Sequence, residues 1–181
     1  MEKSCSEGPV IMPVVSMGVA WIVILDFIVW FLLSIFCALA AFKRNVDSFR
    51  PDGFLYRPRR WEGGGRVYEK YLFVKAWKPL LPDGAKPFKG GFEKKNLRSR
   101  DAAYLEEFIK ESCRAELTHW LLIFVSPVFF IWNPPFVGLI MIAYALVMNL
   151  PCIITQRYNR PRFITMLDRE RQRLKSSSTP C

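Results

Sequence analysis

Three long apolar runs constrain the fold of this chain more than any other feature. They cover residues 14–42, 117–132 and 136–155 of a chain of 181 residues. A helix that crosses the hydrocarbon core of a bilayer needs about 20 predominantly apolar residues, and runs of this length are not typical of a soluble core. The runs predict an all-α integral membrane protein with three transmembrane helices, placed in the cell membrane as a multi-pass protein.

The flanking residues set the expected boundaries. Residues 1–13 form an N-terminal lead, and the first helix, 14–42, would be about 43 Å long, so it would cross with a tilt. Asp101 precedes strong helix formers, which predicts an interfacial helix that continues into the membrane over residues 101–132, weakened at Pro127. "WNPP" at 132–135 predicts a tight turn. The third helix, 136–155, is expected to be interrupted by "NLP" at 149–151.

Basic residues predict the orientation. Residues 43–116 hold eighteen Lys/Arg against eleven Asp/Glu, and residues 155–181 hold seven against two. Because cytoplasmic segments retain Lys and Arg, we expect the N-terminus outside and both the 43–100 segment and the tail, 156–181, inside. In an alternative arrangement the second and third runs form a shallow re-entrant hairpin, which leaves both basic segments on the same side.

The basic excess also indicates anionic partners. Its combination with apolar helices favours anionic membrane lipids and phosphorylated or lipid-linked substrates, and no basic motif typical of a nucleic-acid-binding fold is present. Within the interfacial segment 43–100, the alternation in "RVYEKYLFVKAW" predicts short extended elements between turns at "EGGG" and "KPLLPDG". Its Trp and Tyr residues suit the head-group layer.

Several kinds of site are excluded. The five cysteines, at 5, 37, 113, 152 and 181, form no CxxC pair and predict neither a disulfide framework nor a zinc site. A single histidine excludes histidine-rich iron centres, so no metal or other cofactor is expected. The acyltransferase signature HxxxxD is absent because Phe124 stands at the Asp position, and "EGGG" lacks the GK[ST] of a phosphate-binding loop.

The sole histidine, His119, lies one helical turn after Glu116. This i,i+3 spacing puts both side chains on one helix face, together with Ser112 and Ala115. A carboxylate beside an imidazole fixes its tautomer, as a general base requires. The alternatives are a structural polar pair at the membrane interface and half of a metal site, for which no second ExxH motif exists.

A second polar group follows the third apolar run. In "QRYNRPR" the residues Arg157, Asn159 and Arg160 should emerge on the side of His119, although anchoring by the positive-inside rule also explains the arginines. Asn149 lies inside the run, where a polar side chain either lines a functional cavity or holds helices together. Asp26, in the first helix, should face the bundle or a water pocket and pair with a buried donor.

Three strings carry a resemblance to a known family. "WEGGGRVYEKYLFVKAWKPLLPDG", "RAELTHW" and "NLPCIITQRYNRPR", in this order, resemble the small integral-membrane glycosyl-4,4'-diaponeurosporenoate acyltransferases of staphyloxanthin biosynthesis. Members of that family attach a fatty acyl group to the C6 hydroxyl of a glucose that is linked to a carotenoid acid. The matching positions are Glu62, Trp77, Lys78, Asp83, Gly84, Arg114, Glu116, His119, Asn149, Pro151, Arg157, Asn159, Arg160 and Pro161.

The resemblance implies a membrane acyltransferase that acts on a sugar hydroxyl of a lipid-linked acceptor, with acyl-CoA or an acyl lipid as the donor. In this interpretation His119 is the general base and Glu116 orients it. Arg157, Asn159 or Arg160 would stabilise the oxyanion or hold donor phosphates. The other substrate-binding candidates are Asn149, Trp77, Lys78, Asp83 and Arg114. The alternatives are a non-enzymatic lipid-binding or assembly subunit and a membrane esterase.

A short turn at "WNPP" would make the last two helices antiparallel neighbours. We therefore expect Glu116 and His119 to lie within about 10 Å of at least one of Asn149, Arg157, Asn159 and Arg160, since packed helices are about 8–10 Å apart. We also expect "VKAWKPLLPDG" to fold over this site as a lid.

Overall fold

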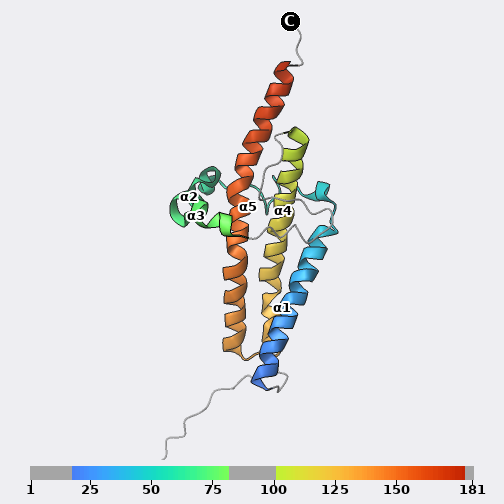
Figure 1. Cartoon of the computed structure of the whole chain (residues 1–181), viewed down its shortest axis with the longest axis vertical. Helices are drawn as coiled ribbons and strands as arrows, with labels where there is room; N and C mark the ends of the chain where they lie inside the picture. Colours follow the sequence, from blue (N-terminus) through green and yellow to red (C-terminus); the bar gives the residue numbers. More distant parts are fainter. Residues whose placement is uncertain (1–17, 82–100, 178–181) are drawn as a thin grey trace, which may run out of the picture.

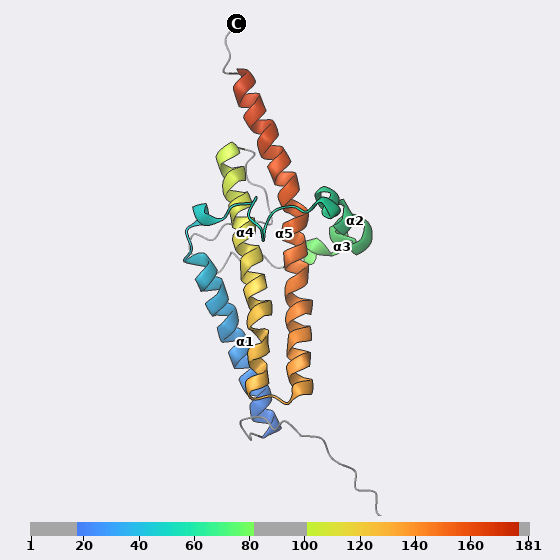
Figure 2. The ribbon, with the colours of Figure 1, turned by 180° about the vertical axis from the view of Figure 1, so that it is seen from behind.

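Three long helices lie side by side in the computed structural model, which describes residues 18–81 and 101–177 (Figures 1 and 2). They are α1 (Val19–Phe42), α4 (Ala102–Val125) and α5 (Pro135–Ser177). Each is long and apolar enough to cross a membrane, α4 together with the 3₁₀ helix that follows it. The predicted all-α class and the three apolar helices are confirmed, with first-helix residues 14–17 outside the described part.

The junction between α4 and α5 follows from its prolines. Pro127 lies at the start of a 3₁₀ helix, η4 (Ser126–Ile131). The second apolar run therefore changes from α-helix to 3₁₀ helix near the residue where a weakened helix was expected. Pro135 begins α5, where a missing N–H leaves no helical hydrogen bond unmade. The turn predicted at "WNPP" is therefore confirmed, and it makes α4 and α5 antiparallel neighbours (Figure 1).

The interruption expected at 149–151 was wrong, and the helix continues past 155, the predicted end of the third membrane span. Helix α5 continues through Pro151 and Pro161 to Ser177, so most of the basic tail is helical. A proline inside a helix removes one backbone hydrogen bond, and the packing of α4 along α5 supports the helix on both sides of Pro151. Residues 178–181 of the tail lie outside the described residues.

The extended elements predicted in the 43–100 segment were also wrong. The segment contains short helices instead: η1 (Val46–Ser48), η2 (Arg60–Gly65), α2 (Arg66–Leu72), α3 (Val74–Trp77) and η3 (Lys78–Leu80). A lone strand would leave its backbone N–H and C=O groups without a partner strand, whereas a helix satisfies them within the segment. No strand occurs in the described residues.

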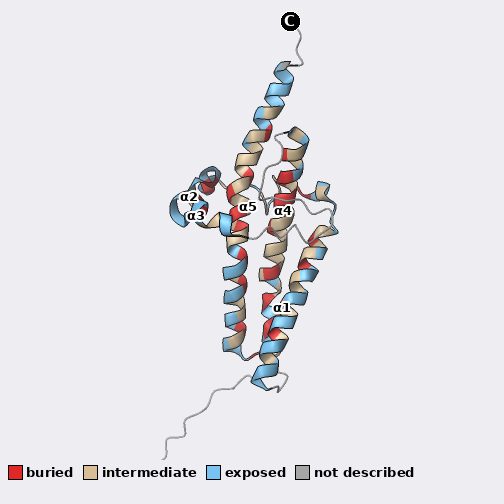
Figure 3. Ribbon diagram, in the orientation of Figure 1, coloured by how far each residue is buried: buried red, intermediate tan, exposed pale blue. Residues whose placement is uncertain are grey.

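Polar contacts tie α1 to the other helices. Near its start, Asp26 Oδ1 accepts hydrogen bonds from Trp132 Nε1 and Asn133 Nδ2, both at 2.8 Å, which confirms the expected pairing of Asp26 with buried donors. At its end, the ring of Phe42 lies 4.7 Å from the Arg114 guanidinium. Buried residues line the contacts between the long helices, and exposed apolar residues face outward (Figure 3).

Candidate functional site

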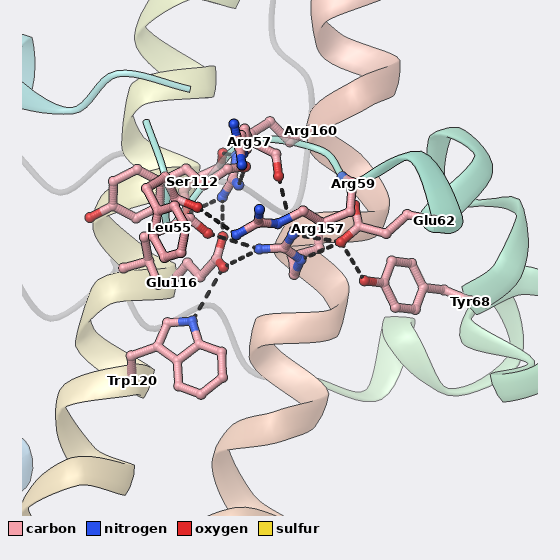
Figure 4. Close-up of polar contacts among 12 residues, drawn as sticks. Leu55, Arg57, Arg59, Glu62, Tyr68, Ser112, Glu116, Trp120, Arg157 and Arg160 are labelled. Atoms are coloured by element: carbon pink, nitrogen blue, oxygen red, sulfur yellow. Dashed lines mark hydrogen bonds and ion pairs between the residues drawn. The ribbon is translucent and has the colours of Figure 1, made fainter. Parts of the chain in front are cut away.

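A cluster of buried charges joins α4 and α5 just where both helices leave the apolar part of the bundle (Figure 4). Glu116, on α4, is fully buried and lies between two arginines of α5. Its Oε1 accepts from Arg157 Nη1 at 2.9 Å, and its Oε2 accepts from Arg160 Nη2 at 2.7 Å. Trp120 Nε1 donates to the same carboxylate at 3.3 Å.

Arg157 uses every hydrogen that its guanidinium can donate. It binds Glu116, it donates from Nε to Glu62 Oε1 at 2.7 Å and from Nη2 to the same oxygen, and it donates to the carbonyls of Leu55 and Arg57. These are five hydrogen bonds, the number of N–H groups in a guanidinium. Arg157 therefore fastens the 55–62 segment to α4 and leaves no N–H for a substrate.

The guanidinium of Arg160 is also hydrogen-bonded to other groups of the protein. Its Nε donates to Ser112 Oγ at 2.9 Å, and its Nη1 donates to the Tyr56 carbonyl at 2.7 Å. Ser112 and Glu116 lie four residues apart on α4, and both contact Arg160, which confirms that they share a helix face. Such a buried, fully hydrogen-bonded ion cluster fixes the relative position of its elements.

Glu62 completes the cluster from the glycine-rich turn. Its Oε2 accepts the backbone N–H of Arg59 at 3.1 Å, which closes the turn, and Tyr68 donates to its Oε1 at 3.0 Å. Burial and the neighbouring carboxylate raise the pKa of Tyr68 to about 12, against an opposing effect of Arg157. Gly65 lets this turn approach α5: its φ is +93°, and a Cβ there would lie 3.0 Å from the Tyr158 carbonyl oxygen.

His119 lies one turn along α4 from Glu116, and its partner is on α5. Its Nδ1 is 2.9 Å from Asn149 Oδ1. Asn149 is buried, and its Nδ2 donates to the Ala145 carbonyl at 2.8 Å. A carbonyl accepts only, so this bond turns the amide nitrogen away from the histidine and presents the amide oxygen to it.

The structure thus pairs the site residues differently from the expectation. Glu116 was expected to orient His119, but its contacts are with Arg157, Arg160 and Trp120. The i,i+3 spacing shows which face two residues share, but a charged donor on the neighbouring helix attracts the carboxylate more strongly than a neutral imidazole does. The predicted convergence is confirmed, because His119 meets Asn149, and Glu116 meets Arg157 and Arg160.

The two groups lie at different depths along α5. At 1.5 Å per residue, Asn149 is about 21 Å from Pro135 and Arg157 is about 33 Å from it. A hydrocarbon core is about 30 Å thick. If α5 enters this core near Pro135, the histidine lies inside it and the charge cluster lies at its edge.

The segment expected to form a lid does reach α5. Lys78 Nζ donates to Asn159 Oδ1 at 2.8 Å and lies 5.3 Å from the centroid of the Tyr158 ring. Burial lowers the pKa of Lys78, and the positive charge of Arg162 lowers it further. Trp77 packs against the cluster of Tyr68, Val74 and Tyr158. Lys78 of η3 and Asn159 of α5 are thus brought together, and Asn159 is two residues beyond Arg157 on α5.

Two other predicted residues are not placed at this site. Arg114 contacts Glu111 at 2.5 Å and the ring of Phe42, so it serves the contact between α4 and α1. Asp83 lies outside the described residues. Among residues 18–81 and 101–177, no three His, Cys, Asp or Glu side chains are grouped so that they could hold a metal ion.

Sequence reasoning missed several members of the charge cluster. Glu62 and Tyr68 were not assigned to the site, although a lone glutamate in "RRWEGGG" is a signal, since its carboxylate can cap the turn that the glycines make. The carbonyls of Leu55, Tyr56 and Arg57 carry no signal in the sequence, because every residue has one. Their role depends on where the chain passes.

The fold and the site define a class: small helical proteins that have three helices of membrane-spanning length, a buried charge cluster between the last two of them, and a single histidine one helical turn from that cluster. Residues 52–169 match the family described as glycosyl-4,4'-diaponeurosporenoate acyltransferase. The chain belongs to this family and is an acyltransferase. This favours an enzyme over the non-enzymatic subunit left open above.

Relatives from Staphylococcus aureus support this assignment. The glycosyl-4,4'-diaponeurosporenoate acyltransferase of strain MRSA252 is 31% identical over 138 residues, which cover 76% of this chain and 83% of the relative. The acyltransferase of the same name from strain bovine RF122 / ET3-1 is 30% identical over 138 residues, which again cover 76% of this chain and 83% of the relative. No solved structure matches the chain.

Proposed function

We propose that this protein transfers a fatty acyl group to a sugar hydroxyl of a glycosylated carotenoid acid within the cell membrane. The names of its relatives supply the acceptor class, and the three apolar helices supply a place for two substrates with long apolar parts. The observation that carries the proposal is the bond between His119 and Asn149, because it prepares a basic nitrogen at membrane depth.

Asn149 determines which nitrogen of His119 is basic. Since the amide oxygen of Asn149 faces Nδ1 and can only accept, Nδ1 carries the proton. Nε2 is then the nitrogen that carries the lone pair of the neutral ring, and it is the atom that takes up a proton. Asn149 thus does for His119 what a carboxylate does in other general-base pairs: it holds the tautomer and the orientation of the ring, without adding a charge.

The reaction follows from this arrangement. Nε2 removes the proton of the acceptor hydroxyl while the hydroxyl oxygen attacks the carbonyl carbon of the acyl donor. The tetrahedral intermediate collapses, the bond to the leaving group breaks, and the leaving group takes the proton back from Nε2. The amide oxygen of Asn149 stabilises the imidazolium through Nδ1–H in between. The apolar surroundings limit the access of water, which would hydrolyse the donor.

The charge cluster supports this chemistry indirectly. Arg157 has no N–H left for a substrate, and Arg160 is held by Ser112, Glu116 and Tyr56. We assign both arginines and Glu116 a positioning role: they fix α4 against α5, and so fix His119 against Asn149. Lys78 and Asn159 are the better candidates to bind an anionic group of the donor, because the Lys78 ammonium has three N–H groups and donates one of them to Asn159.

Acyl transfer in proteoliposomes tests this proposal. The purified protein is given acyl-CoA, or an acyl lipid in a parallel sample, together with a glycosylated carotenoid acid, and acyl esters are measured by mass spectrometry. The wild type should form the ester, and His119→Ala and His119→Gln should lose on the order of 100-fold or more in rate, since a positioned general base is removed.

Thr118→Ala is the matched control, because its hydroxyl bonds only to the Arg114 carbonyl of its own helix. It should keep its activity. Activity of folded His119→Ala within a few-fold of the wild type would show that His119 is not the base. Release of free fatty acid in place of ester would show that water is the acceptor and that the protein is an esterase.

A further inference from the structure

The segment from Tyr71 to Leu80, called the elbow here, displays apolar side chains that residues 18–81 and 101–177 leave exposed. Tyr71 is 65% exposed, Phe73 is 69% exposed and Leu80 is 83% exposed. These residues belong to a run of short helices, from α2 to η3, that stands out sideways from α5 (Figures 1 and 3). The described part of the chain supplies no partner for this surface.

The backbone of the elbow is held firmly even though these side chains are exposed. Val74 is completely buried and packs with Tyr68 and Tyr158, and Ile154 of α5 lies against the same cluster. Trp77 Nε1 donates to the Leu72 carbonyl at 2.7 Å, which ties the two short helices together. The exposed side chains are therefore presented by a rigid support.

Phe73 adopts a backbone conformation that is unfavourable for its residue type. Its φ is +49°, and it is the only residue other than glycine with a positive φ in the described part of the chain. This position ends α2, where glycine is the usual residue because it has no Cβ. A bulky aromatic residue at such a position is strained, and strain of this kind points to a role for the side chain outside the fold.

The level of the elbow along α5 identifies what covers it. Exposed large apolar side chains of α5 run from Phe136 to Leu150, and the next one is Leu174. The elbow packs on α5 at Ile154 and Tyr158, about 29–35 Å from Pro135 at 1.5 Å per residue. A hydrocarbon core is about 30 Å thick. The elbow lies where this core would end, about level with the end of α1 (Figure 1).

We propose that the elbow inserts Tyr71, Phe73 and Leu80 into the boundary between head groups and acyl chains of the leaflet in which α1 ends. The aromatic side chains suit this layer. Lys70, whose Nζ lies 5.2 Å from the centroid of the Tyr71 ring, supplies positive charge for anionic lipid head groups, whereas Lys75 is paired with Glu69. The elbow thereby holds the charge cluster at the membrane surface and the histidine below it.

Spin labels on the protein in liposomes of phosphatidylcholine and phosphatidylglycerol test this proposal. Single cysteines at positions 73 and 80 are labelled in a chain whose Cys5, Cys152 and Cys181 are serine, and collisions with oxygen and with a water-soluble nickel complex are compared. Leu139, exposed on the apolar part of α5, provides the lipid reference, and the exposed Asp168 provides the aqueous reference.

Labels at 73 and 80 should collide more often with oxygen and less often with nickel than the label at 168 does, as the label at 139 should. In a Phe73→Gly background, the label at 80 should collide more often with the nickel complex because the aromatic anchor is lost. The melting temperature of Phe73→Gly in detergent should not fall, since glycine suits a positive φ. Labels at 73 and 80 that collide with nickel as often as the label at 168 would overturn the proposal. So would a label at 80 whose collision rates are the same with and without Phe73.

Discussion

Glu116 is buried between Arg157 and Arg160, and its removal should affect folding before it affects chemistry. Loss of one partner from a buried ion cluster leaves uncompensated charge and typically costs about 3–5 kcal/mol. We expect Glu116→Ala to lower the yield and the melting temperature in detergent, and His119→Ala, which loses one hydrogen bond to a neutral partner, to lower them less. A Glu116→Ala protein that melts like the wild type would contradict the positioning role.

Tyr68 gives the cluster a dependence on pH. Its pKa is raised from 10 to about 12, so the folded protein keeps this proton where the unfolded chain has lost it. Stability from Tyr68 is therefore fully present below pH 10 and is lost as the pH rises toward 12, at up to about 1.4 kcal/mol per pH unit.

Denaturation of the wild type and of Tyr68→Phe at a series of pH values measures this effect. The unfolding free energy of the wild type minus that of Tyr68→Phe should be constant below pH 10. Above pH 10 it should fall, because only the wild type loses stability there. A difference that does not change between pH 9 and pH 12 would show that the phenol is not protected.

At this scale the sequence showed which residues take part but not how they pair. His119, Glu116 and Asn149 stand out because they are polar residues in or beside apolar runs. The partner of each depends on the register between α4 and α5, and the sequence contains no direct measure of that register. A spacing within one helix was therefore interpreted as a contact, while the ion pairs of Glu116 and the hydrogen bond of His119 to Asn149 form between helices.

Among the elements, α5 and the short helices were the hardest to predict. Pro151 suggested a break because a proline removes a hydrogen bond, but the packing along α4 outweighs one lost bond. The sequence 66–77 has apolar residues at both helical and alternating spacings, so periodicity alone did not decide between helix and strand. The three long helices were predictable because their apolar length leaves few alternatives.

Asp26 provides a test at the scale of elements, since it attaches α1 to the turn between η4 and α5. Asp26→Ala would leave the N–H groups of Trp132 and Asn133 without an acceptor, at a cost of about 1–3 kcal/mol for each buried group. Asp26→Asn keeps an acceptor oxygen and should lose less. Melting temperatures in detergent compare them with Ser34→Ala, whose hydroxyl bonds only to its own helix. Equal values for all three variants would contradict this attachment.

For the whole molecule, the basic residues predict that the charge cluster faces the cytoplasm. In cells whose protein lacks Cys5, Cys152 and Cys181, an impermeant maleimide should label a cysteine at the exposed Val19 from outside. A cysteine at Asp168 should be labelled only after permeabilisation, because seven basic residues against two acidic ones keep the end of the chain inside. Labelling of position 168 in intact cells would reverse the topology.

In the proposed mechanism, Asn149 holds His119 with its proton on Nδ1 and leaves Nε2 as the base. Because His119 is the only histidine in the chain, protein labelled with ¹⁵N-histidine and carrying no histidine tag gives the signals of this one ring. Its ¹⁵N spectrum in liposomes near neutral pH measures the tautomer directly. We predict a protonated Nδ1 and an unprotonated Nε2 in the wild type, and loss of this preference in Asn149→Leu. A proton on Nε2 in the wild type, or a spectrum unchanged by Asn149→Leu, would contradict the claim.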